Sequence, residues 1–206
     1  ARDHAEGTRL PRRPARARAG VGRARGASAE SWESPIPPPV TNLSYSFQAI
    51  DDPVRDQVWV VSSFDQLWTL SLAGGGEWIH VPAWVGTPRV ATAAVYDPVR
   101  DRLLAIAAPA LGNLEVWELS LAAPVGWNQL TTTNTPSVDN EGPAIYDPIH
   151  DRLVVAGRYL TLALPLSGDP SWATLASTPA SGGGVCGAYD AARGRMILFA
   201  GFTGSD

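Results

Sequence analysis

The chain repeats one short unit four times, and this repetition constrains its fold more than any other feature. Each copy holds an apolar stretch, a turn that begins with aspartate and, in three of the four, continues with proline, and a second apolar stretch. The copies are AIDDPVRDQVWVV (49–61), VYDPVRDRLLAIA (95–107), IYDPIHDRLVVAG (145–157) and AYDAARGRMILFA (188–200). Their anchor aspartates are 45, 50 and 43 residues apart, at Asp52, Asp97, Asp147 and Asp190. A period of this length indicates a repeat architecture in which neighbouring units share a core.

Further landmarks recur at the same period. A six-residue stretch rich in apolar residues follows each of the first three copies, and a tryptophan comes ten residues after the second residue of that stretch. The stretches are LWTLSL (67–72), VWELSL (116–121) and TLALPL (161–166), and the tryptophans are Trp78, Trp127 and Trp172. Because several independent landmarks share one spacing, the repeat is not a chance similarity of short segments.

The pattern within a unit predicts four short strands. In the second unit we expect strands over 91–96, 102–108, 115–121 and 127–131. The Asp-Pro pair between the first two favours a type I turn, because aspartate accepts from backbone amides and proline presets φ. The second strand is almost wholly apolar, as in a strand buried on both faces, and the third alternates with period two. The sequence therefore predicts an all-β protein of four-stranded antiparallel sheets.

These units resemble Kelch repeats, especially the bacterial type with a Tyr-Asp-Pro turn between the first two strands. The aromatic pair of Kelch units matches Trp68 with Trp78 and Trp117 with Trp127, while the third unit has Leu162 in the first position. Small residues replace the Kelch diglycine: Ser62-Ser63, Ala107-Ala108, Ala156-Gly157 and Ala200-Gly201. The resemblance implies a Kelch-type β-propeller fragment of about three and a half four-stranded antiparallel blades. The blades lie near residues 45–90, 91–140, 141–184 and 185–206.

The partial propeller is expected to span residues 31–206. Trp32 lies 19 residues before Asp51, close to the 18 residues that separate Trp78 from Tyr96, so residues 31–40 are interpreted as the last strand of an earlier blade. Propellers close their ring with four to eight blades. We therefore expect the missing blades beyond one or both ends of this segment.

Residues 1–30 differ from the rest in composition. They hold eight arginines against three acids and no aromatic residue, so they cannot bury enough surface to offset the entropy of ordering. We expect a disordered Arg-rich arm or a non-native upstream segment. Residues 31–206 hold eight arginines against seventeen acids, which argues against a nucleic-acid partner. No apolar run is long enough to span a membrane.

No constellation of residues indicates catalysis, a cofactor or a metal. Repeated turn acids such as Asp97 and Asp101 are explained by turn formation and by pairing with neighbouring arginines, whereas calcium needs six to eight oxygen ligands. The three histidines share no ligand spacing, and Cys186 has no activating neighbour in the sequence. We therefore assign no catalytic residue, no metal ligand and no cofactor.

The variable loops are the best candidates for a binding surface. The resemblance places the loops after the second and fourth strands of each blade on one face, and the Asp-Pro turns on the other. Variable loops on a repeated scaffold commonly carry function. The predicted binding residues on this face are Phe64, Trp84, Arg89, Asn113, Asp139, Glu141, Arg158 and Tyr159. Tryptophans at repeated positions are expected in the core instead: Trp68, Trp78, Trp117, Trp127 and Trp172.

The sequence favours a non-enzymatic interaction module that binds a protein or carbohydrate partner through this loop face. The alternative is a propeller that belongs to a larger secreted enzyme, with catalytic residues outside residues 1–206. The bacterial type of repeat and the single cysteine favour an extracellular or periplasmic location.

Overall fold

The computed structural model describes residues 47–62, 67–73, 76–82, 91–109, 111–122, 126–137, 142–178 and 186–199. Within these ranges the chain forms strands and turns, and no helix is long and apolar enough to cross a membrane. The predicted arm (1–30) and the predicted strand of an earlier blade (31–40) lie outside the described residues.

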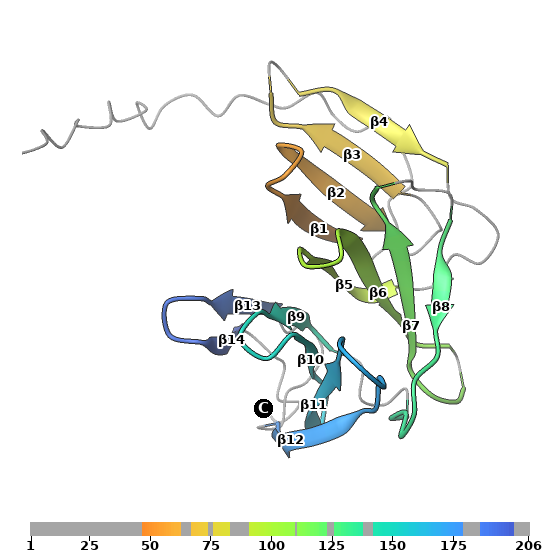
Figure 1. The fold of residues 1–206 in the computed structure, drawn as a ribbon, viewed down its shortest axis with the longest axis vertical. Coiled ribbons are helices and arrows are strands. Elements are labelled where there is room, and N and C mark those ends of the chain that lie inside the picture. The colour runs from red at the N-terminus through yellow and green to blue at the C-terminus, as the bar shows by residue number, and fades with distance from the viewer. Residues whose placement is uncertain are drawn as a thin grey trace, which may run out of the picture. The chain divides into compact units, whose positions relative to one another are not determined.

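The strands form three antiparallel sheets of four and one hairpin (Figure 1). Sheet order follows chain order in each, so every strand pairs with its neighbour in the sequence. The first unit consists of β1 (Phe47–Asp52), β2 (Gln57–Ser62), β3 (Leu67–Ser71) and β4 (Trp78–Val81). The second consists of β5 (Ala91–Asp97), β6 (Arg102–Ala107), β7 (Glu115–Ser120) and β8 (Asn128–Leu130). The third consists of β9 (Ala144–Asp147), β10 (Arg152–Ala156), β11 (Leu160–Pro165) and β12 (Ala173–Ser177), and the fourth of β13 (Cys186–Asp190) and β14 (Arg195–Phe199). The predicted all-β fold with four-stranded antiparallel sheets is confirmed.

The anchor aspartate shapes the turn between the first two strands of each unit. Asp97 is fully buried, and its Oδ1 accepts from the amides of Val99 and Arg100 at 3.1 and 3.2 Å. Asp52 makes the same two contacts in the first unit. The last turn residue has a left-handed backbone, with φ of 51°, 48° and 47° at Asp56, Asp101 and Asp151, and 60° at Gly194. Aspartate and glycine are among the residues that tolerate this conformation.

Alternate residues of the second strands pack against opposite neighbours. On β6, Leu103 and Ala105 pack with the first unit, and Leu104 and Ile106 pack with the third; all four are 0% exposed. Each Leu or Ile buried in this way stabilises the fold by about 1.5–3 kcal/mol. First-unit partners are Ile50, Trp59, Val61 and Leu67, and third-unit partners are Leu153, Val155, Leu162, Leu164, Leu166 and Trp172. The core therefore lies between the units, which explains the nearly continuous apolar sequence of β6.

The repeated tryptophans occupy two kinds of environment. Trp127 and Trp172 are 5% and 4% exposed within the clusters between units, as the repeat predicts. Trp117 is half-buried and packs against the cluster between the first and second units. Trp68 and Trp78 are also half-buried.

Arginine–aspartate pairs join successive units at the turn end of the sheets. Arg55 of the first unit donates to Asp101 of the second at 2.9 and 2.5 Å. Arg100 of the second unit donates to Asp151 of the third at 2.9 and 2.6 Å. Each guanidinium also donates to the anchor aspartate of its own unit, at 3.1 Å in both cases. The acids of these turns were expected to pair with neighbouring arginines, and the structure adds that the Arg55–Asp101 and Arg100–Asp151 pairs cross between units.

These pairs shift the acidity of the groups involved. Hydrogen bonds from Arg55 hold the pKa of Asp101 below its ordinary value, and Arg100 does the same for Asp151. A tyrosine of the same unit also donates a hydrogen bond to each of these aspartates. In the third unit, Tyr146 Oη donates to Asp151 at 3.1 Å. Burial and this hydrogen bond raise the pKa of Tyr146 to about 12. At neutral pH the tyrosine is therefore a donor and the aspartate an ionised acceptor.

Candidate functional site

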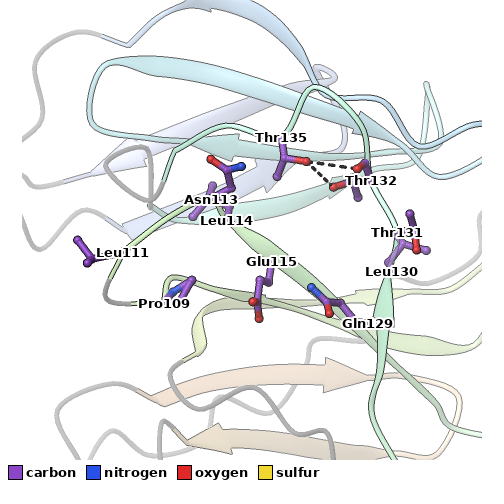
Figure 2. A pocket seen from close by; sticks show the side chains of 10 residues that line it. All are labelled: Pro109, Leu111, Asn113, Leu114, Glu115, Gln129, Leu130, Thr131, Thr132 and Thr135. Carbon is purple, nitrogen blue, oxygen red and sulfur yellow. Dashed lines mark hydrogen bonds between the residues drawn. The ribbon is translucent and has the colours of Figure 1, made fainter.

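A cleft opens beside the second unit, with a volume of about 530 Å³ (Figure 2). Three parts of the chain form it: the β6–β7 loop, the adjoining ends of β7 and β8, and the segment that follows β8. The lining residues are Pro109, Leu111, Asn113, Leu114, Glu115, Gln129, Leu130, Thr131, Thr132 and Thr135. Its size lies within the range of pockets that hold small ligands.

The segment after β8 folds back across the β6–β7 loop and forms one wall of the cleft. Asn113 and Ser137 form an antiparallel bridge, and the amide of Leu114 donates to the carbonyl of Pro136 at 2.9 Å. The hydroxyls of Thr132 and Thr135 lie 3.1 Å apart, and Thr135 also bonds to the Thr132 carbonyl (Figure 2). The wall is therefore a hydrogen-bonded turn fixed at both ends.

The third unit holds this wall from behind. Thr133 and Ser171 form a parallel bridge, in which the amide of Thr133 donates to Pro170 and the amide of Trp172 donates to Thr133, both at 3.0 Å. Asn134 Nδ2 donates to Ser171 Oγ at 2.9 Å. Because two units contribute, the shape of the cleft depends on how the second and third units pack.

The lining offers mainly neutral hydrogen-bonding groups. Asn113 and Gln129 supply amides, and three threonines supply hydroxyls. Glu115 is the one carboxylate among the described lining residues, and its Oε2 accepts from Trp117 Nε1 at 2.9 Å, which fixes its orientation. Leu114 is 2% exposed and forms part of the floor, whereas Leu111 is 89% exposed at the rim.

The described residues of this lining can bind and orient a ligand, and they include no catalytic pair. Among the described residues that line it there is no histidine or cysteine, and none of them supplies a second carboxylate beside Glu115 for acid–base work. Within the described ranges, no group of three His, Cys, Asp or Glu side chains could hold a metal ion. The described lining residues therefore offer hydrogen-bonding groups to a ligand.

Of the residues predicted for the loop face, one lines the cleft and two lie elsewhere. Asn113 is in the lining. Arg158 and Tyr159 lie in the β10–β11 turn of the third unit, where the guanidinium carbon is 5.3 Å from the centre of the Tyr159 ring. Tyr159 is 56% exposed, so this stacked pair is a surface feature and not part of the cleft. The other predicted residues lie outside the described residues: Phe64, Trp84, Arg89, Asp139 and Glu141.

Sequence reasoning missed most of the cleft. Glu115 and Gln129 lie inside predicted strands, where a side chain is read as part of a sheet face. The threonines belong to the run TTTNTP (131–136), which lies after the expected strand 127–131. This run of hydroxyl residues follows the end of a strand, and such segments lie on the surface and present side chains to a ligand. The run could therefore have indicated this part of the cleft.

Comparisons with known proteins bear on the fold alone. No protein-family model matches the chain, and no curated protein matches it. Among solved structures, the chain is similar to the major Malassezia sympodialis allergen Mala s 1, at 12% sequence identity and a TM-score of 0.50. The match covers 73% of this chain and 47% of the allergen chain, so this chain spans less than half the length of that structure.

Proposed function

We propose that the units are blades of a Kelch-like β-propeller and that the chain is a non-enzymatic interaction module. It binds its partner, a glycan or a protein, through loops on the face opposite the Asp-Pro turns. The cleft beside the second unit is the observation that carries this proposal. Its described lining combines amides, hydroxyls and a carboxylate around a small apolar floor, so it can bind a ligand through several hydrogen bonds.

The lining favours a neutral, hydroxyl-rich ligand such as a short glycan. Threonine hydroxyls and the amides of Asn113 and Gln129 can each donate and accept, so they match hydroxyl groups in either role. The Glu115 carboxylate accepts only, and residues 31–206 carry more acids than arginines. Both features disfavour a ligand that carries carboxylate, sulfate or phosphate groups.

The test is binding of the purified chain to an array of neutral and acidic glycans. Neutral glycans should be bound, and Gln129→Ala combined with Asn113→Ala should weaken binding by about tenfold or more, which corresponds to about 1.4 kcal/mol. Asn128→Ala is the matched control, because Asn128 is exposed on the same strand and lies outside the cleft lining.

Equal loss of binding in Asn128→Ala and in the double variant would show that the cleft is not the binding site. Preference for acidic glycans would contradict the argument from the lining. If a protein partner binds equally well after both cleft substitutions, the binding surface lies on other loops.

A further inference from the structure

The turn that forms one wall of the cleft has two sides, which make different contacts. The side chains of Thr132 and Thr135 line the cleft (Figure 2). Between them in the sequence, Thr133 and Asn134 bond to the third unit. Because the four residues are consecutive and form one turn, a displacement on the cleft side also displaces the side that the third unit holds.

Three hydrogen bonds between described residues hold the turn to the third unit, and we call them the clasp. Two are backbone bonds of Thr133, with Pro170 and Trp172, at 3.0 Å each. The third joins the side chains of Asn134 and Ser171 at 2.9 Å and is exposed. Asn134 also has a left-handed backbone, with φ of 50°, which asparagine tolerates better than most residues. This one residue therefore shapes the turn and binds it to the third unit.

The threonine hydroxyls of the wall face a ligand as acceptors. Thr135 Oγ1 donates to the carbonyl of Thr132 at 3.3 Å. Thr132 then supplies the hydrogen in the 3.1 Å contact between the two hydroxyls. Each hydroxyl has one hydrogen and two lone pairs, so each keeps a lone pair for a ligand that donates. Sugar hydroxyls that donate to both threonines would bridge the first and last residues of the turn and hold it in the shape that the clasp binds.

We infer that occupancy of the cleft is coupled to the clasp, and that Asn134 and Ser171 are positioning residues for the ligand. The inference rests on the proposed binding of a neutral glycan in the cleft. Neither residue is in the described lining, so each acts through the turn. A glycan that favours the closed turn strengthens the clasp, and by thermodynamic linkage a closed clasp strengthens glycan binding by the same factor.

The clasp can open without unfolding the units. Packing between the second and third units rests on an apolar cluster in which Leu104, Ile106 and Leu153 are 0% exposed. The bond between Asn134 and Ser171 is exposed by contrast, and water competes for both of its groups. Substitutions in the clasp should therefore change the wall of the cleft and leave the fold intact.

Amide exchange tests the clasp without a ligand. Asn134→Gly removes the side-chain bond, and glycine adopts the left-handed backbone freely. In this variant and in Ser171→Ala, the amides of Thr133 and Trp172 should exchange about tenfold faster, because local opening exposes them. Both amides donate across the clasp in the unaltered chain.

Two controls separate this effect from a general loss of stability. Exchange at the buried Leu104 should not change in either clasp variant, because the apolar cluster is untouched. Ser167→Ala is the matched substitution, since Ser167 is exposed in the same connection between β11 and β12 and lies outside the clasp. It should exchange like the unaltered chain at every position named.

Calorimetry with a free oligosaccharide tests the coupling. The probe is the neutral glycan that binds most tightly on the array. Asn134→Gly and Ser171→Ala should each weaken its binding by about tenfold, and Asn134→Asp should retain it. Aspartate tolerates the left-handed backbone, and its carboxylate accepts from the Ser171 hydroxyl. By linkage, saturating glycan should slow exchange of the Thr133 amide in the unaltered chain by about the same factor.

Unchanged exchange of Thr133 in both clasp variants overturns the inference, and so does faster exchange without a loss of glycan affinity. In either case, glycan binding and its dependence on Gln129 and Asn113 remain intact. Failure of the proposed function has a different signature: no neutral glycan binds the unaltered chain, or binding survives the Gln129→Ala and Asn113→Ala double variant. That result removes the coupling together with the proposed site.

Discussion

Arg55 places both terminal nitrogens on the carboxylate of Asp101, at 2.9 and 2.5 Å, across the boundary between the first and second units. The acceptor is the turn residue whose backbone is left-handed, with φ of 48°. One aspartate therefore satisfies two demands: it tolerates the conformation that ends the turn, and it supplies the carboxylate that the preceding unit binds. A paired, planar contact of this kind fixes orientation as well as distance.

A double-mutant cycle on Arg100 and Asp151 should show that the pair is coupled. Arg100→Gln and Asp151→Asn should each destabilise the chain by about 1 kcal/mol, because both side chains are partly exposed and solvent weakens the attraction. The double variant should lose less than the sum of the two, by about 0.5 kcal/mol or more. Urea unfolding measures all four proteins. Additive losses would mean that the contact contributes nothing beyond its separate parts.

The contribution of Asp101 should disappear in acid. Arg55 holds the pKa of Asp101 below the ordinary value of 3.8, so on acidification the unfolded chain takes up this proton first. Its contribution is therefore present above about pH 4 and is lost as the pH falls through the folded-state pKa. The stability difference between the unaltered chain and Asp101→Asn should shrink between about pH 5 and pH 2, as measured by urea unfolding. A difference that is constant over this range would contradict the ionised pair.

Two buried tryptophans provide a matched test of a hydrogen bond. Trp59 and Trp172 are both 4% exposed, but Trp59 Nε1 donates to the buried Asp52 at 3.0 Å, whereas Trp172 Nε1 has no partner among the described residues. Replacement by phenylalanine removes similar volume from each. Trp59→Phe should cost about 1.5–3 kcal/mol more than Trp172→Phe, because a bond to a charged acceptor is lost only in the first.

Thermal or urea unfolding of the two variants gives the comparison. The Trp59→Phe variant should also raise the pKa of the Asp52 carboxyl. Burial raises that pKa, and hydrogen bonds from Trp59, Gln57 and Arg55 more than offset this effect. If Trp172→Phe is the more damaging substitution, packing and not the indole hydrogen bond governs both sites.

The sequence predicted the sheets well because their determinants are local. The strand ranges follow from alternation and from the Asp-Pro turns, and the expected strand 102–108 corresponds to β6 at Arg102–Ala107. The pairing between units was not predictable in the same way. Asp101 is one residue from Arg100 in the sequence, yet its partner is Arg55, 46 residues away.

The cleft was predicted only through Asn113, for a similar reason. Its walls come from separate segments that meet because the third unit holds the turn at 132–135 through Thr133. Sequence pattern identifies a loop and its polarity, but the meeting of two loops depends on packing between units. Glu115 and Gln129 belong to the site because of where their strands end, and spacing alone does not reveal that.

The boundary between the third and fourth units lacks both members of the pair. His150 stands where Arg55 and Arg100 stand in the earlier units, and Gly194 stands where Asp101 and Asp151 stand. His150 Nδ1 lies 2.8 Å from its own anchor, Asp147. Across the boundary, Tyr189 Oη reaches Asp147 at 3.5 Å, a longer contact than the tyrosine bonds of 3.0 and 3.1 Å in the second and third units.

Restoring both residues should therefore strengthen this boundary more than restoring either one. Gly194 already has φ of 60°, close to the values of its aspartate counterparts, so Gly194→Asp adopts the backbone without a change. A Cβ there would lie 2.8 Å from Ile149 Cδ1, the end of a flexible and 64% exposed side chain that can move aside.

His150→Arg alone gains no carboxylate across the boundary, and Gly194→Asp alone gains no guanidinium. The combined variant should be more stable than the sum of the single effects by about 0.5–1 kcal/mol, as measured by urea unfolding and by slower amide exchange in β13 and β14. Single effects that simply add would show that the arginine–aspartate contact depends on features of the first two boundaries that the third lacks.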